Sequence, residues 1–224
     1  MLRARNLGEA DRILTMFTLE RGKLDAIAKG LRRGRSRLGG RLEFGNEVLL
    51  ALHHGRSLDV IAGAEILTEH WRSLVVPERF AVASAACETI DALCEPDLAL
   101  PEVYALLVDM LAAVAASSAP QFLLARFQLR LLGALGLAPP IDACIHCGEP
   151  LGDRAWLDTR AGGFTGAACR EPGSAVLEVT KKDLRTLRER VRPTPRASEA
   201  IVLLVAHHLG RRPKTETALA EMRR

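Results

Sequence analysis

Aromatic residues, cysteines and long uncharged runs are scarce in this chain of 224 residues. Aromatic side chains make up 4% of it, and only Phe17 and Phe44 lie within the first 70 residues. A surface that stacks bases on aromatic rings is therefore not supported near the amino terminus. The longest uncharged stretch of the apolar middle, residues 110–125, holds 16 residues with two serines and a proline, which excludes a membrane span.

The sequence also lacks the short motifs of the common enzyme classes. It contains no GxxxxGK[ST] phosphate loop, GxGxxG fingerprint, HExxH pair or GxSxG turn, so we do not expect an enzyme. Two tandem histidine pairs, at 53–54 and 207–208, cannot direct both side chains to one site, and we interpret them as surface residues. The charged amino terminus does not resemble a secretory signal. We therefore expect a cytoplasmic protein whose five cysteines are thiols or metal ligands rather than disulfides.

Basic charge is concentrated at both ends of the chain. Residues 1–41 carry a net charge of +7, residues 42–179 carry −10 and residues 180–224 carry +7. This segregation favours a polyanionic partner for the two ends, and a solvated basic face without a partner is the alternative. The densest cluster, residues 29–41, has six basic residues and four glycines, which let the backbone approach phosphates closely. Phosphate contact without sequence readout is the simpler expectation.

The period of the apolar residues changes near Trp71. Before it, short runs separated by glycines at 13–19, 23–28, 47–52 and 58–61 predict the strands of a small barrel or sandwich. The five-stranded OB barrel is the member of this class most often associated with nucleic acids. Only residues 2–5 can supply its first strand, so we expect the barrel to be incomplete there.

After Trp71 the apolar pattern is helical. Three helices are predicted at 77–94, 101–117 and 120–135, and two more begin at Thr180, as an N-cap, and at Pro195, with Gly210 as the stop. Cys87 and Cys94 share one helix face, where we expect them to be buried. The predicted class is α+β. Its parts are an OB-fold domain at 1–70, a helical domain at 71–140 and 177–224, and a loop-rich insertion at 141–176.

The insertion contains the one candidate metal site. Cys144 and Cys147 have the spacing of half a four-ligand zinc site, and Cys169 begins a second half. Proline stands where the fourth cysteine is expected. Zinc held by these three cysteines requires His146, Glu171 or water as a fourth ligand, and a metal-free loop is the alternative.

Eight short segments carry a resemblance to a known family. They are Leu7–Thr15, Arg21–Lys23, Ala28–Arg33, Ser36–Leu42, Pro77–Phe80, Arg126–Gly133, Cys144–Gly148 and His208–Lys214. In this order they resemble the RecO family of bacterial DNA repair and recombination mediators. The resemblance implies an OB domain, a helical domain and a zinc-finger-like insertion. Two departures are the missing fourth cysteine and a start about eight to ten residues later than in relatives, where the first strand is expected.

The resemblance implies single- and double-stranded DNA binding, strand annealing and, with RecR, loading of RecA onto DNA coated with single-strand-binding protein. An RNA-binding or ribosome-associated OB protein is the alternative. The predicted DNA-binding residues are Arg21, Lys23, Lys29, Arg32, Arg33, Arg35, Arg37, Arg41, Lys181, Lys182 and Arg185.

The resemblance also implies that the helical domain binds the acidic carboxy-terminal tail of the single-strand-binding protein. Arg126 and Arg130 are four residues apart, so they share a helix face and could pair with the carboxylates of the tail. Phe122 or Phe127 would line an apolar pocket beside them. Alternatively, Phe127 belongs to the core and the arginines pair with acids such as Asp109.

Overall fold

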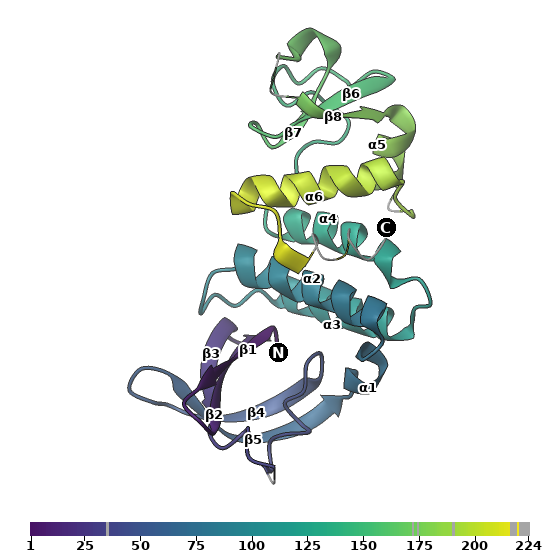
Figure 1. Ribbon diagram of the computed structural model, residues 1–224. Helices are drawn as coiled ribbons and strands as arrows, with labels where there is room; N and C mark the ends of the chain where they lie inside the picture. The colour runs from purple at the N-terminus through teal and green to yellow at the C-terminus, as the bar shows by residue number, and fades with distance from the viewer. Residues whose placement is uncertain (35, 172, 174, 190, 216–218, 220–224) are drawn as a thin grey trace. The chain divides into compact units, whose positions relative to one another are not determined.

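The computed structural model describes residues 1–224 except 35, 172, 174, 190, 216–218 and 220–224. It divides into two compact units, Met1–Pro120 and Gln121–Arg224 (Figure 1). Each unit contains strands and helices, so the predicted α+β class is confirmed. Among the described residues, no helix combines the length and the apolar character needed to span a membrane. The domain boundaries given above stay a prediction.

The first unit begins with a five-stranded sheet. Its strands are β1 (Arg3–Leu7), β2 (Asp11–Thr18), β3 (Gly22–Ala28), β4 (Glu47–His53) and β5 (Asp59–Thr68). Their order is β1-β2-β3-β5-β4, and only β3 and β5 pair in parallel. Alternate residues such as Leu14, Met16 and Leu24 face the core, as the two-residue period of a strand requires. The predicted amino-terminal β domain is therefore confirmed. Among the described strands β1 and β4 do not pair, so the sheet is open and does not form the closed OB barrel.

Three helices complete the first unit: α1 (Trp71–Leu74), α2 (Pro77–Leu93) and α3 (Pro101–Ala116). Both long helices begin with proline followed by glutamate, which suits the positive end of the helix dipole. Their predicted ends are correct to within one residue. Cys87 and Cys94 are buried as expected, and desolvation raises their pKa values to about 12 and about 11. Both thiols are therefore protonated at neutral pH.

From Pro120 onward the chain forms a second set of elements. They are the 3-10 turn η1 (Pro120–Phe122), α4 (Leu124–Ala134), β6 (Arg154–Asp158), β7 (Gly163–Thr165), η2 (Ala167–Cys169), β8 (Ala175–Thr180), α5 (Lys181–Arg188) and α6 (Pro195–Leu209). The sheet order is β7-β6-β8, and α4 packs against α6. The third predicted helix starts later than expected because η1 is a separate turn. The loop-rich insertion contains strands too short to give a periodic signal.

The starts of α5 and α6 and the end of α6 lie where the sequence predicts them. The two histidines near the end of α6, however, are not the surface residues that we expected. Thr180 caps α5, and Gly210, with φ 66°, ends α6. His207 and His208 are half-buried rather than surface residues. His207 Nδ1 donates to the Thr159 carbonyl at 2.7 Å, because the turn after β6 lies against α6. The prediction was wrong because burial of this helix face depends on that tertiary contact.

Candidate nucleic-acid interface and cysteine cluster

The basic residues of 29–41 lie in the turns that connect β3 to β4 in the first unit. Five of them are described and exposed, and within the described part of the chain none makes an ion pair. These five are Lys29, Arg32, Arg33, Arg37 and Arg41. The remaining predicted residue of the cluster, Arg35, lies outside the described residues. We call this segment, residues 29–41, the basic loop.

One carboxylate and several neutral backbone groups hold the basic loop. The carboxylate of Asp11 accepts a hydrogen bond of 2.7 Å from the backbone N–H of Gly30, and the arginine side chains bond carbonyls. The N–H of Arg32 donates to the Ala10 carbonyl at 3.0 Å, and its guanidinium donates to the Gly8 carbonyl at 3.1 Å. The guanidinium of Arg41 donates to the carbonyl of Arg37. Because carbonyls carry no net charge, the positive charge of both side chains is still available to phosphates.

Arg21 and Lys23, predicted to join the same contact, are instead paired with acids. Arg21 bonds Asp59 at 2.5 Å and Asp97 at 2.8 Å, and its hydrogen bond is the main reason that the pKa of Asp59 is lowered. The ammonium of Lys23 donates to the Asp91 carbonyl at 2.5 Å and lies 3.7 Å from its carboxylate, with the side chain only 15% exposed. Arg21, in the β2–β3 turn, thus contacts the start of β5 and the loop after α2, and Lys23, on β3, contacts α2 near its end.

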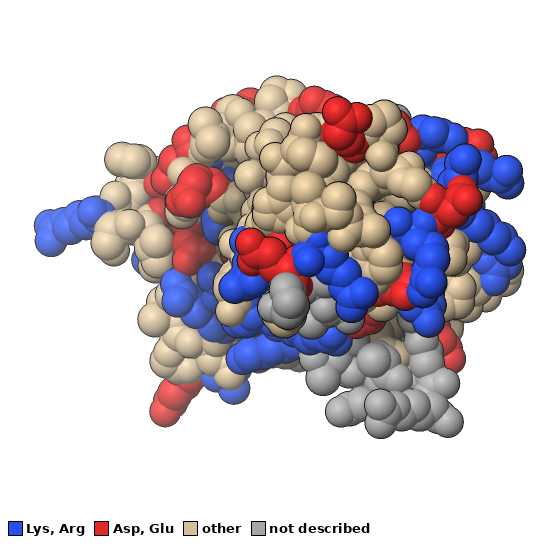
Figure 2. Space-filling model, turned by 90° about the horizontal axis from the view of Figure 1, so that it is seen from above, with Lys and Arg blue, Asp and Glu red and all other residues tan. Residues whose placement is uncertain are grey.

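The second predicted basic group lies on α5 and is exposed. Lys181 is 3.7 Å from Asp153, and Arg185 is 3.5 Å from Glu189. Lys182 forms no ion pair with any described residue. On the face drawn in Figure 2, Lys and Arg side chains form groups with Asp and Glu among them. Two of its three charges are thus partly compensated by nearby acids, unlike those of the described cations of the basic loop.

Sequence reasoning missed a cavity beside the basic loop. Its volume is about 570 Å³, and its lining includes Arg12, Arg32, Phe44, Trp71 and Phe80. Two of these three rings lie beyond residue 70, on α1 and α2, so the count of aromatic residues in the strand region underestimated what the fold brings together. The sequence did offer a signal for this grouping, because Trp71 and Phe80 lie on either side of Pro77, the first proline of the helical region.

In the second unit, the folding of the insertion brings its three cysteines together. The sulfur atoms of Cys144, Cys147 and Cys169 all lie within 4.8 Å of one another. The first two precede β6, and the third ends η2. Among the described residues, no fourth ligand atom from Cys, His, Asp or Glu belongs to this group. Three thiols could therefore hold a metal ion, with one position open.

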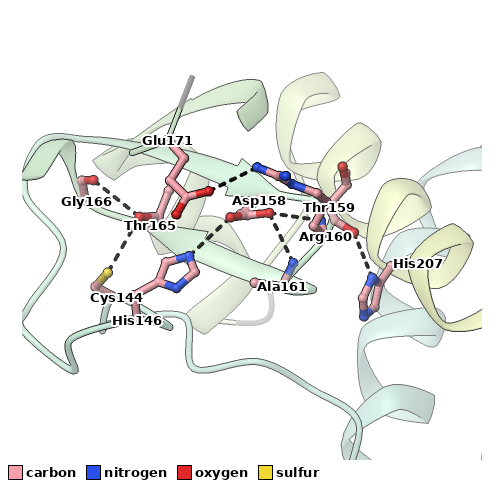
Figure 3. Close-up of polar contacts among 10 residues, drawn as sticks. All are labelled: Cys144, His146, Asp158, Thr159, Arg160, Ala161, Thr165, Gly166, Glu171 and His207. Atoms are coloured by element: carbon pink, nitrogen blue, oxygen red, sulfur yellow. Dashed lines mark hydrogen bonds and ion pairs between the residues drawn. The ribbon is translucent and has the colours of Figure 1, made fainter. Parts of the chain in front are cut away.

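The thiols of this cluster differ in acidity. Burial alone would raise the pKa of Cys144, but backbone hydrogen bonds, the largest from Gly166, and a bond with the Thr165 hydroxyl lower it to about 6. Figure 3 shows the Cys144 sulfur directed at Thr165, 3.7 Å from its Oγ1. Hydrogen bonds with Cys147, and then with Cys144, raise the pKa of Cys169 to about 11. The lowered pKa favours the thiolate form of Cys144, which is the form that binds metal ions.

The two side chains expected as a fourth ligand are engaged elsewhere (Figure 3). His146 Nε2 lies 3.1 Å from the Asp158 carboxylate, and Glu171 accepts a bond of 3.1 Å from Arg160. Asp158 also accepts from the backbone N–H groups of Arg160 and Ala161 at 2.9 and 3.1 Å, which shapes the turn after β6. Water is therefore the candidate for the open position.

The residues predicted to bind an acidic tail lie on η1 and α4. Arg126 and Arg130 are exposed, and within the described part of the chain neither forms an ion pair. Phe127 is only 3% exposed, so its ring belongs to the core. Phe122 is half-buried, with the Arg192 guanidinium 3.3 Å from its ring centroid. Of the two aromatic candidates, Phe122 is therefore the accessible one.

Two family models match almost the whole chain: Recombination protein O N terminal at residues 1–70 and Recombination protein O C terminal at residues 76–215. The chain belongs to the RecO family. This RecO-family chain is 39% identical over 180 residues to the DNA repair protein RecO of a Nocardioides species, covering 78% of this chain and 74% of the relative. The RecO of Thermobifida fusca is 36% identical over 177 residues, covering 78% and 72%. That of Bifidobacterium adolescentis is 38% identical over 180 residues, covering 78% and 73%. The predicted resemblance is confirmed, and with it a role in DNA repair.

Proposed function

We propose that this RecO-family protein is a non-enzymatic mediator of recombination that acts in the cytoplasm. It binds single- and double-stranded DNA, anneals complementary strands and, with RecR, helps to load RecA onto DNA coated with single-strand-binding protein. Family membership supports this role, as does the absence of the common catalytic motifs from the sequence. The observation that carries the proposal is the basic loop, whose five described cations are exposed and make no ion pair with other described residues.

The charge of the basic loop suits annealing as well as binding. Lysine and arginine side chains neutralise phosphates and release counterions without reading the bases. Two complementary strands repel each other through their phosphates, and this repulsion falls when a cationic surface lies between them. The same surface therefore holds one strand and lowers the electrostatic barrier to the approach of the second.

The deciding experiment measures annealing of complementary strands coated with single-strand-binding protein. We expect the wild-type protein to accelerate annealing and the double variant Arg32→Ala/Arg33→Ala to lose most of that acceleration. The matched control is Arg154→Ala, because this exposed arginine is already paired with Glu178. Tighter binding to RNA than to DNA, with no annealing, would instead favour the RNA-binding alternative.

We also propose that Cys144, Cys147 and Cys169 hold a zinc ion, with water in the fourth position. The clustered sulfurs and the low pKa of Cys144 support this, and the ion would supply a cross-link between the two ends of the insertion. Native mass spectrometry should find one zinc per chain in the wild type and in the control Cys94→Ala, and none in Cys147→Ala. A wild-type protein without metal after growth in ample zinc would leave a loop held by packing alone.

A further inference from the structure

We propose that the cavity beside the basic loop binds one unstacked nucleobase of a DNA single strand. This inference rests on the proposed DNA binding and adds a site for the base to the phosphate contacts. The cavity, of about 570 Å³, is lined by both guanidinium groups and aromatic rings. A nucleotide presents the two matching groups, a phosphate and a flat π-face, so one lining can take both.

The aromatic part of the lining is open on one side. Phe80, on the first turn of α2, is 43% exposed although it packs at 5.2 Å from Phe44, with the two rings tilted by 58°. The start of α1 positions Trp71, because the buried Asn46 side chain accepts from the backbone N–H groups of His70 and Trp71, each at 3.0 Å. The exposed Phe80 ring favours coverage by another apolar surface.

The cationic part of the lining comes from β2 and from the basic loop. Arg12 shares a strand face with the core residues Leu14 and Met16, which places it at the end of the sheet's inner face. It is exposed and forms no ion pair with a described residue. Arg32 is anchored by its bond to the neutral Gly8 carbonyl, and no acid among the described residues forms an ion pair with it. These two arginines can hold the phosphate of a nucleotide whose base lies on the rings.

Only an unpaired base can use such a cavity. In a duplex each base is stacked and paired, so it would have to leave the helix at a cost before reaching the rings. The basic loop contacts phosphates in both forms of DNA, whereas the aromatic lining adds affinity for the single strand alone. The cavity thus shifts the preference of the protein toward single-stranded DNA.

The first test compares Phe80→Ala with the wild-type full-length protein on a thymidine oligonucleotide and on a duplex of equal length. Loss of one stacking contact predicts about a 5- to 150-fold weaker binding of the single strand, with duplex binding changed by less than about twofold. The dependence on salt should stay the same, because no phosphate contact is removed. Phe80→Tyr should restore binding, and Leu98→Ala, which removes an apolar side chain of similar exposure, should have no effect.

The second test uses Trp71 as a reporter in the variant Trp156→Phe, which leaves it as the only tryptophan. The thymidine oligonucleotide should quench its fluorescence, and an abasic oligonucleotide of equal length should bind more weakly without quenching. Equal binding and equal quenching by the two would overturn the base site while leaving the proposed DNA binding intact. A wild-type protein that binds neither the single strand nor the duplex would overturn both.

Discussion

At the scale of single residues, the segment Arg21-Gly22-Lys23 has a structural role. Gly22 has φ 65°, and a Cβ built on it would lie 1.8 Å from the carbonyl oxygen of Leu98. The backbone of the β2–β3 turn therefore touches the backbone of the loop before α3. The flanking cations pair with acids of the same region. Together these contacts hold the sheet against the helices of the first unit.

We predict that Gly22→Ala destabilises the protein by about 2 kcal/mol or more. The methyl group would force a left-handed backbone on alanine and a clash with a carbonyl that no side-chain rotation relieves. Gly34→Ala is the matched control, because it lies in open space without a positive φ. Urea unfolding of the two variants measures the difference in stability. Equal midpoints would contradict the prediction, because they would show that the Leu98 backbone shifts at little cost in free energy.

Asp183 gives a prediction with a pH dependence. Its carboxylate accepts from the Thr180 N–H at 2.8 Å, the Thr180 hydroxyl at 2.7 Å and the Thr194 hydroxyl at 2.5 Å. Burial opposes ionisation, but these bonds outweigh it, and the pKa of Asp183 is lowered from 3.8. We expect Asp183→Asn to cost about 1–3 kcal/mol at neutral pH, since an amide has one acceptor oxygen instead of two.

The sign of this dependence follows from the lowered pKa. The stabilisation by Asp183 is complete above the unfolded pKa, near 3.8, and is lost as the pH falls through the lower folded value. The difference in urea midpoint between wild type and Asp183→Asn should therefore be constant from neutral pH to about pH 5 and shrink toward about pH 3. A difference that grows in acid would contradict the assigned bonds.

At the scale of elements, helix α4 has one buried apolar face and one exposed charged face. Phe127 faces the core, whereas Arg126 and Arg130 face solvent. We predict that Arg126→Ala and Arg130→Ala each weaken binding of the acidic tail peptide of single-strand-binding protein by about 5-fold or more, because each removes a charge-assisted bond. Fluorescence anisotropy with labelled peptide measures this, with Arg154→Ala as control. Wild-type affinity in both folded variants would remove this helix face from the site.

At the scale of the whole molecule, the uneven distribution of charge governs how DNA binding responds to salt. If the basic loop makes the main phosphate contacts, Arg32→Ala/Arg33→Ala should lower the slope of log K against log salt by about 1.4 to 1.8, or about 0.7 to 0.9 per contact. Arg154→Ala should leave the slope unchanged. If the slope is unchanged in the double variant, the main phosphate contact is not the basic loop, and we would assign it to Lys181, Lys182 and Arg185 on α5.

The sequence by itself determined the α+β class, the ends of α2, α3 and α6, the exposed basic loop and the family. Local signals suffice for these features, because proline and threonine start helices, glycine ends them and alternation marks strands. It also placed Phe127 among the alternatives for the core. The short strands β6, β7 and β8 were missed, because runs of three to six residues are too short to show a clear periodic pattern.

Only the tertiary structure decided which charges are free and which side chains meet. Arg21 and Arg32 look alike in sequence, yet among the described residues Arg21 pairs with two acids, whereas Arg32 bonds neutral carbonyls. The three cysteines, and the rings of Phe44, Trp71 and Phe80, gather from segments separated along the chain. Such groupings depend on how sheet and helices fold back on each other, and the free energy of that packing comes from contacts that have no local signature in the sequence.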